Sequence, residues 1–231
     1  MIDQKRRNFL KTAAVLGTGL TLHGLNPNSQ SLSRSSSEKL SVLECIHQRR
    51  SVRSFRPDPV PDEHIKKILD TARMAATAGN QQPWKFLVVR DKEKLNELKK
   101  ASIQQYLNYY EQKGMDKEKI KEQKKGLESH YEKIFKAPVF IVVLVDTQSK
   151  HPDYNKHDGP LAVANLMLAA RALGYGTCYF TDSITEEITR QVLQIPKRYQ
   201  RICITPIGAP EEWPETPPKK ELNEYIIYEN F

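Results

Sequence analysis

The run of residues 139–145 constrains the fold more than any other part of the chain, because every side chain in it is apolar. Successive side chains of a strand point to opposite faces of a sheet, so a strand of this composition is buried on both faces. Its β-branched residues also favour an extended backbone over a helix. We therefore expect a sheet that contains this strand and has a layer of structure on each side.

Helical periodicity and turn residues place the remaining elements. Ser41 and Glu44 have the spacing of a capping box, which predicts a helix from about Val42 to Gln48. The pattern predicts further helices over residues 62–76, 92–136 with a break at Gly114, 161–173 and 184–193. It predicts further strands over residues 84–90, 175–181 and 201–207. This order favours an α+β fold over a regular alternation of strands and helices.

The distribution of charge argues against a nucleic-acid partner. The net charge of the 231-residue chain is +8, and residues 1–39 and 92–136 each hold four more basic than acidic side chains, which accounts for all of it. The rest of the chain is neutral and offers no continuous basic face to a phosphate backbone. No apolar run reaches the roughly 20 residues that a membrane span needs, so we expect no stable membrane insertion.

Residues 1–39 have the features of a targeting segment. Arg6 and Arg7 precede an uncharged, mostly apolar stretch over residues 12–25, and a serine-rich linker follows. This pattern resembles a twin-arginine export signal, which carries folded proteins out of the bacterial cytoplasm. A chance pair of arginines before a core helix is the alternative, which the three glycines of the stretch oppose. We therefore predict a periplasmic protein whose folded domain covers residues 40–231.

The cysteines and histidines do not show the spacing of a metal site. Cys45, Cys178 and Cys203 are far apart in the sequence and have apolar neighbours, so we interpret them as small core residues. Two histidines and two aspartates gather in one segment and offer a metal site as an alternative to a solvated loop, which is favoured. They are His151, Asp153, His157 and Asp158.

Several segments offer groups that suit a bound cofactor. Residues 49–53 combine three guanidiniums with the hydroxyl of Ser51, a set of donors that matches a phosphate, although a solvated basic turn is the alternative. Residues 75–84 combine small side chains with Thr77 and Asn80, which suits a planar ligand or an ordinary connection equally. Residues 174–181 offer backbone N–H groups, and residues 217–220 offer two lysines after a rigid turn. Because no nucleophile or acid–base pair accompanies them, such a site needs its chemistry from a cofactor.

Five motifs in this order resemble the nitroreductase family of FMN-dependent oxidoreductases. They lie at residues 49–55, 80–86, 137–138, 169–177 and 207–210, the last of them before paired lysines. The resemblance extends from about Leu40 to the C-terminus. It implies a central, mostly antiparallel sheet flanked by helices, and an intertwined homodimer with two flavins at its interface. The helix expected over residues 161–173 suits that interface, because it is apolar all round.

The resemblance implies FMN as the cofactor, and the flavin rather than a protein side chain carries the chemistry. The implied cofactor-binding residues are Arg49, Arg50, Ser51, Val52, Arg53, Ala76, Thr77, Ala78, Asn80, Tyr179, Phe180, Thr181 and Lys219. In the family, the first segment holds the phosphate and the ribityl chain, and its last basic residue reaches the pyrimidine edge of the flavin. The second segment contributes from the other subunit, the third lies near flavin N5, and the lysine lies near the phosphate.

Residues 92–136 resemble the lid of the iodotyrosine deiodinase branch, which binds its amino-acid substrate through a Glu, a Tyr and a Lys. Tyr109 matches the tyrosine, but Gln105 stands at the Glu position and Tyr131 near the Lys position. The resemblance therefore implies a lidded flavin reductase rather than an enzyme for zwitterionic tyrosine. The implied substrate-binding residues are Gly79, Gln105, Tyr106 and Tyr109; packing of the tyrosine face on the body is the alternative.

The resemblance also implies a ping-pong reaction. An electron donor, NAD(P)H or a redox protein, reduces the flavin and leaves, and a small aromatic or quinone-like substrate takes its place. Nitroaromatics, quinones and haloaromatics are the expected classes of substrate. A flavin-binding or ligand-binding protein without turnover is the alternative.

Overall fold

The computed structural model describes residues 40–230. These residues belong to one compact unit, Lys39–Phe231. The predicted export signal over residues 1–39 lies outside the described residues.

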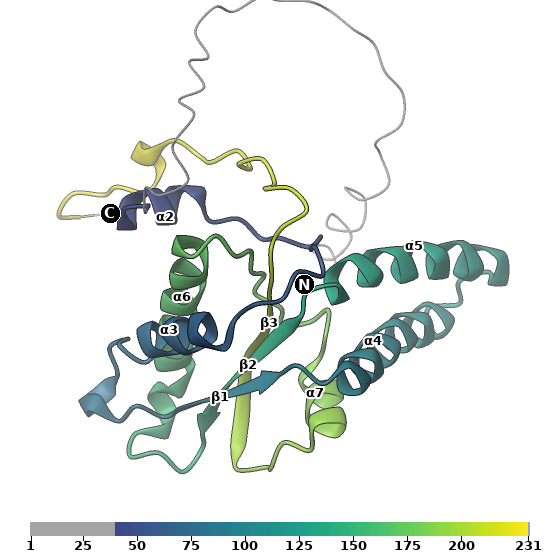
Figure 1. Cartoon of the computed structure of the whole chain (residues 1–231), viewed down its shortest axis with the longest axis horizontal. Helices are drawn as coiled ribbons and strands as arrows, with labels where there is room; N and C mark the ends of the chain where they lie inside the picture. The colour runs from purple at the N-terminus through teal and green to yellow at the C-terminus, as the bar shows by residue number, and fades with distance from the viewer. Residues whose placement is uncertain (1–39, 231) are drawn as a thin grey trace, which may run out of the picture. The chain divides into compact units, whose positions relative to one another are not determined.

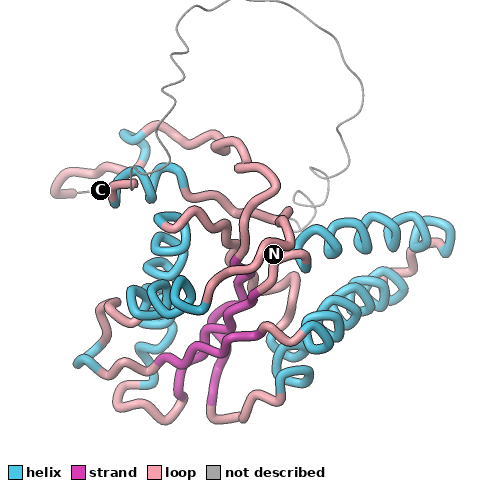
Figure 2. The backbone as a smooth tube through the Cα atoms, in the orientation of Figure 1, coloured by secondary structure: helices cyan, strands magenta, loops and turns pink. Residues whose placement is uncertain are grey.

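A three-stranded antiparallel sheet forms the centre of the domain (Figures 1 and 2). The strands are β1 (Trp84–Val89), β2 (Val139–Asp146) and β3 (Tyr199–Ile207), and β2 lies between the other two. Trp84 pairs with Val145 on one side of β2, and Ile207 pairs with Val139 on the other. Residues 139–145 are all buried, which confirms the predicted burial of this strand on both faces.

Alternate residues of β2 face two separate hydrophobic cores. Phe140, Val142 and Leu144 belong to the core that α4 (Lys92–Gln112), α5 (Lys117–Phe135) and α7 (Glu186–Leu193) cover. Val139, Ile141 and Val143 belong to the core beneath α3 (Asp62–Ala72) and α6 (Asn155–Ala172). Figure 1 shows the two groups of helices on opposite sides of the sheet. The expected layer on each face is therefore present.

Local sequence determines where the helices begin. The hydroxyl of Ser41 accepts from the Glu44 N–H at the start of α2 (Val42–Gln48), and Glu44 bonds back to the Ser41 N–H, so the predicted capping box is present. Asp91 and Asp116 cap α4 and α5 in the same way, and each accepts from two backbone N–H groups. The expected break at Gly114 is confirmed, because this glycine has a φ of +68° between α4 and α5.

The strand predicted over residues 175–181 is wrong. This segment makes only isolated bridges, in which Gly176 pairs with Gly208, Phe180 with Ile204 and Thr177 with Ser51. The bridges at Gly176 and Phe180 share one antiparallel register, but Pro206, which stands opposite Cys178 between them, has no backbone N–H to donate, so no continuous ladder with β3 forms. A side chain at position 176 would also meet Val52, whose nearest atom lies 2.7 Å from an ideal Cβ there.

The loop expected around residues 151–158 is also wrong in part. Helix α6 begins at Asn155, six residues earlier than the apolar pattern indicated, and carries Pro160 within its first turns. Asp158 is buried there and accepts hydrogen bonds from Gln81 and the Ala78 N–H, so it is not solvated. Within residues 40–230 no group of three or more His, Cys, Asp or Glu side chains is arranged to hold a metal ion.

Two further features concern burial. All three cysteines are buried, as expected of small core residues, and burial raises the pKa of Cys203 to about 12. None of the helices in the described part of the chain has the length and apolar character needed to cross a membrane.

Candidate functional site

The basic segment, residues 49–53, leaves the end of α2 in an extended conformation. Arg49 has a ψ of 131°, and its N–H caps the helix by donating to the Cys45 carbonyl. The Val52 N–H donates to the Thr177 carbonyl at 2.9 Å, and the Val52 side chain is buried in the core. This anchor leaves Arg49, Arg50, Ser51 and Arg53 half-buried at the edge of the domain.

The charge of the basic segment reaches the neighbouring residues 176–178. Burial raises the pKa of the Cys178 thiol, and the guanidinium of Arg53, the hydroxyl of Ser51 and the guanidinium of Arg49 act in the opposite direction. Three members of the segment therefore face one side of the segment that follows α6. The sequence predicted both segments to contact the cofactor, and the structure brings them together.

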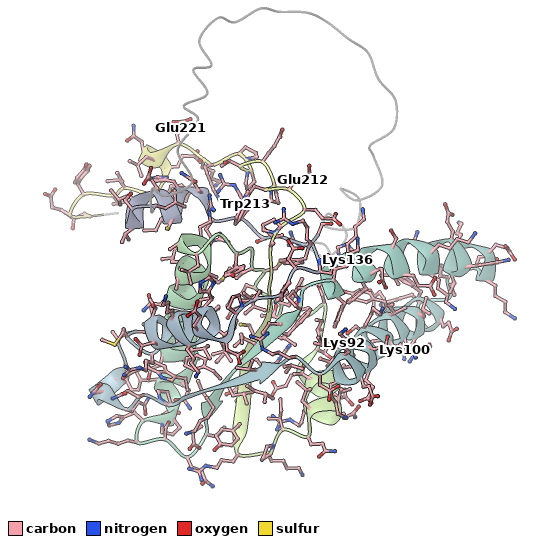
Figure 3. All side chains as sticks on the ribbon, viewed as in Figure 1. Lys92, Lys100, Lys136, Glu212, Trp213 and Glu221 are labelled. Atoms are coloured by element: carbon pink, nitrogen blue, oxygen red, sulfur yellow. The ribbon has the colours of Figure 1, made fainter. Side chains whose placement is uncertain are left out.

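A strap formed by residues 211–216 crosses the same region. Glu211 accepts from Ser54 at 2.5 Å and from Lys136 at 3.0 Å. Arg50 donates to the hydroxyl of Thr216, and the guanidinium of Arg171 at the end of α6 stacks 3.9 Å from the Trp213 ring. Figure 3 shows Trp213 close to the end of α2, and Lys136 at the end of α5. The strap therefore lies next to the basic segment, and Lys219 follows it three residues later in the chain.

Four guanidiniums in this region have no carboxylate partner among residues 40–230. Arg49, Arg50, Arg53 and Arg171 bond only to carbonyl, amide or hydroxyl oxygens or to none, and Arg171 Nε is buried without any partner. Of the six arginines elsewhere in the domain, Arg201 is buried and bonds to two backbone carbonyls. The other five pair with a carboxylate at 2.5–2.8 Å: they are Arg56, Arg73, Arg90, Arg190 and Arg198. Half-buried cations that repel one another are costly without an anion. This set of donors fits a phosphate from outside the chain.

The loop over residues 76–82 is the second predicted contact region. Gln81 fixes it, because its amide donates to buried Asp158 at 2.6 Å and its oxygen accepts from the His151 N–H at 2.7 Å. Gly79, Asn80 and Gln82 have φ values of +53°, +54° and +47°, so the loop bends sharply. Ala76, Gly79 and Asn80 remain exposed, while Thr77 and Ala78 are half-buried.

Within one chain these two regions lie at opposite ends of α6. The loop is anchored at Asp158 in the first turns, whereas Arg171 in the last turn donates to Gln48, next to the basic segment. Thirteen residues of helix separate the anchors, which is about 20 Å at 1.5 Å per residue. The structure therefore does not bring the loop and the basic segment of a single chain together.

The segment with Tyr179, Phe180 and Thr181 continues from the Cys178 region. Phe180 is buried and exchanges backbone hydrogen bonds with Ile204. Tyr179 and Thr181 on either side of it are exposed, Tyr179 by 38%. Both side chains are thus accessible beside the basic segment.

The predicted lid is a pair of helices, α4 and α5, that pack on each other (Figure 1). The Tyr106 ring lies 6.4 Å from the rings of Tyr110 and Tyr131, on the face that meets the core. Tyr109 is only partly buried, and its outer side carries the Lys113 ammonium at 5.6 Å. Gln105 accepts from the hydroxyl of Thr185 at 3.0 Å. Of the predicted substrate-binding residues on the lid, Tyr106 lies deepest in the packing.

Sequence reasoning missed several residues that organise this region. Trp213 and Glu211 shape the strap, Gln81 and Asp158 hold the loop, and Arg201 bonds the segment after Thr181. Each acts through partners at least 17 positions away in the sequence. The short motifs around them therefore contained no signal for these contacts, except that Gln81 stood inside the loop already singled out.

Comparison with known proteins agrees with the fold. The model of the family described as "Nitroreductase family" matches residues 46–209. The chain belongs to the nitroreductase family. A protein named "Putative NADH dehydrogenase/NAD(P)H nitroreductase" from Methanothermobacter thermautotrophicus is 33% identical over 183 residues, which are 77% of this chain and 82% of the relative.

Two further comparisons involve iodotyrosine deiodinases. The enzyme of that name from Thermotoga neapolitana is 28% identical over 190 residues, which cover 82% of this chain and 97% of the relative. A crystal structure of oxidised iodotyrosine deiodinase bound to FMN and 3-iodo-L-tyrosine aligns with a TM-score of 0.67. It covers 83% of this chain and all of that one at 22% identity. The predicted nitroreductase fold, with an antiparallel sheet flanked by helices, is confirmed.

Proposed function

We propose that this nitroreductase-family protein is an FMN-dependent oxidoreductase that acts on a small aromatic or quinone-like substrate. The observation that carries the proposal is the set of four half-buried guanidiniums without a carboxylate partner in the described domain. A flavin phosphate supplies an anion for Arg49 and Arg50. The relatives named as NAD(P)H nitroreductase and as iodotyrosine deiodinase support a redox activity of this kind.

In this proposal the basic segment and the strap hold one end of FMN. Arg49, Arg50 and Ser51 bind the phosphate and the ribityl chain, and Lys219 approaches after the strap. Val52 contributes through its backbone, because its side chain is buried in the core. Arg53 places a cation at the flavin ring, and the exposed Tyr179 and Thr181 flank the buried Phe180 beside it.

The second contact region requires a homodimer in this proposal. Along α6, Leu161, Ala164, Asn165, Leu168 and Ala172 recur at helical spacing and leave a mainly apolar stripe uncovered, with Leu161 exposed by 48%. When α6 packs on α6 of a second copy in the opposite direction, the loop of one copy meets the basic segment of the other. Ala76, Thr77, Ala78 and Asn80 then contact the cofactor held by the partner.

The apolar groups on α2 and on the tail favour the same assembly. Val42, Leu43 and Ile46 of α2 are exposed by 71%, 68% and 49%, and Tyr225 and Ile227 of the tail by 65% and 52%. Clustered apolar side chains of this size mark a surface that another chain covers. Together with the stripe on α6, they support the intertwined homodimer that the family resemblance implies.

The chemistry comes from the cofactor and the geometry from the chain. When bound, FMN accepts electrons from a donor and passes them to a second substrate. The lid formed by α4 and α5 excludes water from this exchange, and Tyr109 and Gln105 contact the substrate together with Gly79. NAD(P)H or a redox protein serves as the donor. A periplasmic location after twin-arginine export favours the redox protein, because NAD(P)H is scarce there.

Anaerobic reduction of the FMN-loaded full chain tests this proposal. NADH, NADPH or a reduced flavodoxin should bleach the visible flavin absorbance, and a nitroaromatic, a quinone or a haloaromatic should then restore it. Flavin colour that persists with every donor would contradict an enzymatic activity and leave a flavin-binding protein without turnover.

The proposed export signal is tested separately. Replacing Arg6 and Arg7 by Lys should retain the protein in the cytoplasm on cell fractionation.

A further inference from the structure

Arg201 on β3 holds a loop that lies between the lid and the segment with Thr181. Its side chain is buried, with 9% of the residue exposed. Its guanidinium donates to the Thr181 carbonyl at 2.5 Å and to the Ile184 carbonyl at 2.5 Å. Residues 181–185 form no helix or strand, so these two bonds supply contacts that regular structure does not provide there.

Packing alone does not account for an arginine at this position. Burial lowers the pKa of Arg201, and its Nε has no partner among the described residues. The carboxylate of Glu186 accepts from the Arg201 backbone N–H at 3.4 Å and pairs with Arg190 instead of the Arg201 guanidinium. An apolar side chain of similar size would fill this position without the cost of desolvating a guanidinium. The distinct contribution of Arg201 is therefore its pair of hydrogen bonds to the two carbonyls.

The lid contacts the same loop from its other side. The hydroxyl of Tyr131 in α5 donates to the Ser183 carbonyl, and the hydroxyl of Thr185 donates to Gln105 in α4 at 3.0 Å. Arg201 therefore fixes both ends of a short loop that the lid touches in the middle and at its C-terminal end. The loop follows directly on Phe180, whose backbone is paired with Ile204.

We propose that Arg201 is a positioning residue. Its two hydrogen bonds fix residues 181–184, and this keeps the backbone at Thr181 in a fixed position relative to the cofactor and to the lid. This inference rests on the proposed function for the role of Thr181 at the flavin. The two hydrogen bonds form within the chain itself, so their effect on the loop is measurable without the cofactor.

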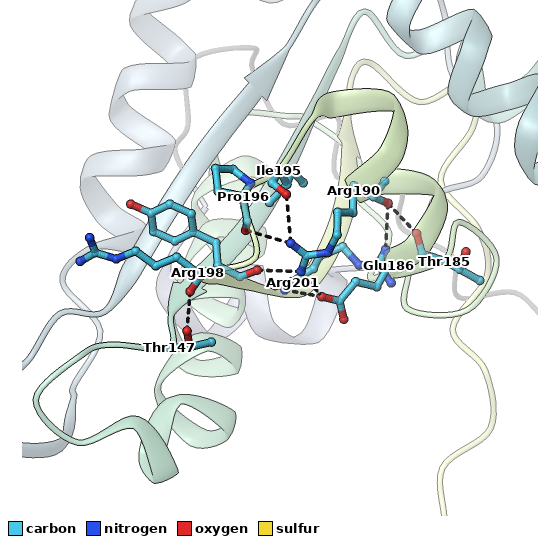
Figure 4. A network of polar contacts seen from close by, with 10 residues as sticks. Thr147, Thr185, Glu186, Arg190, Ile195, Pro196, Arg198 and Arg201 are labelled. Atoms are coloured by element: carbon cyan, nitrogen blue, oxygen red, sulfur yellow. Dashed lines mark hydrogen bonds and ion pairs between the residues drawn. The ribbon is translucent and has the colours of Figure 1, made fainter.

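Arg190 provides a matched control. It lies in α7 and donates to three carbonyls, those of Ile195, Pro196 and Tyr199, at 2.8–3.0 Å (Figure 4). Arg190 thus bonds to the turn before β3 in the same manner as Arg201 bonds to the loop before α7. The Arg190 turn contains none of the proposed cofactor or substrate contacts, whereas the Arg201 loop begins at one.

Hydrogen–deuterium exchange of the full chain without FMN tests whether the Arg201 hydrogen bonds fix the loop. In Arg201→Met, the Phe180 and Ile188 amides, which donate to Ile204 and Thr185 at the two ends of the loop, should exchange about tenfold faster, because two charge-assisted hydrogen bonds that fix the loop are lost. In Arg190→Met, faster exchange should be confined to residues 195–199. Unchanged exchange of the Phe180 and Ile188 amides in Arg201→Met would overturn the proposal.

The FMN-loaded proteins test the positioning. Arg201→Met should still bind FMN, but its flavin absorption bands should shift and its kcat should fall about tenfold with little change in KM, and Arg201→Lys should recover part of both. Arg190→Met should keep the wild-type spectrum and kcat. Equal changes in the two Met variants would overturn the positioning role.

A second variant keeps the test decisive if Arg201→Met does not fold. Arg201→Lys keeps the charge but replaces the two guanidinium nitrogens with one ammonium, so exchange of the Phe180 and Ile188 amides should rise and the spectrum should shift, both less than expected for Arg201→Met. No change in either would overturn the proposal. If the wild type takes up no FMN, the proposed function fails first, while the exchange experiment still decides whether Arg201 fixes the loop.

Discussion

At the scale of single residues, the basic segment brings together like charges that repel one another. Arg49 has no ion pair within the described residues, and the neighbouring guanidiniums of Arg50 and Arg53 repel it. Arg49→Ala should therefore weaken FMN binding roughly tenfold or more, through loss of a charge-assisted contact of about 1.5–3 kcal/mol. The melting temperature of the FMN-free protein should stay the same or rise.

The control for this prediction is Arg56→Ala. Arg56 follows the basic segment by three residues and pairs with Asp58 at 2.7 Å on the surface. Its removal should leave the FMN dissociation constant unchanged, since an exposed pair contributes little. Isothermal titration with FMN measures both variants. Equal affinities of Arg49→Ala and the wild type would contradict the role of the segment.

Asp146 gives a prediction about pH. The hydrogen bonds from Arg198, at 2.6–3.0 Å, lower the pKa of this carboxyl below its usual range. A lowered folded-state pKa stabilises the fold above the unfolded-state pKa, and this stabilisation is lost as the pH falls through the folded-state value. Asp146→Asn should therefore lower the melting temperature at pH 7 and flatten its decline between about pH 4 and pH 2.

Thermal unfolding at several pH values measures this effect. Asp70→Asn serves as the control, because Asp70 pairs with Arg73 on an exposed turn of α3. It should change neither the melting temperature at pH 7 nor its slope by a comparable amount. A parallel decline in Asp146→Asn and the wild type would count against the assigned cause.

At the scale of secondary-structure elements, the lid separates a substrate role from a packing role. Tyr109 and Tyr110 are neighbours on α4, but Tyr110 is 4% exposed whereas Tyr109 is only partly buried. Tyr109→Ala should raise KM for the oxidising substrate and leave FMN content and thermal stability almost unchanged. Tyr110→Ala should instead lose about 3–5 kcal/mol of stability, as expected for a truncated core aromatic.

Steady-state kinetics and chemical denaturation of the two variants make this comparison. A loss of stability in Tyr109→Ala as large as that in Tyr110→Ala would make Tyr109 a packing residue. The proposed contact between the lid and the substrate would then fail, while FMN binding by the body would be unaffected.

Elements with a strong local signal were predicted well from the sequence. The apolar run of β2, the capping box at Ser41 and the break at Gly114 each depend on neighbouring residues, and all three are confirmed. The segment over 175–181 was predicted as a strand because its composition is that of one, but it makes only isolated bridges, with Ser51, Gly208 and Ile204. Pairing between distant segments leaves no periodic trace in a single sequence.

The candidate site likewise contains residues that the sequence revealed and residues that only the structure revealed. Residues 49–53 were recognisable because their donors are consecutive, and the structure places them beside residues 176–181. Trp213, Asp158 and Arg201 were not recognisable, because each acts through contacts made only after folding. The separation of the two contact regions along α6 also required the structure.

At the scale of the whole molecule, that separation predicts complementation between subunits. Arg49→Ala damages the basic segment, and Gln81→Ala releases the loop from Asp158. Each homodimer should bind FMN weakly. In a mixed dimer one site carries both changes and the other carries neither, so mixing the variants should restore one tight site per dimer. Recovery of no tight site on refolding the mixture would contradict a site shared between two copies.

The central claim is that this chain binds FMN, and mass spectrometry of the flavin released from the purified full chain tests it most directly. In the proposed site the basic segment binds the terminal phosphate of FMN, so we predict FMN at one molecule per chain. Release of FAD would contradict the assignment of the phosphate site, and so would failure of the protein to retain any flavin after incubation with FMN.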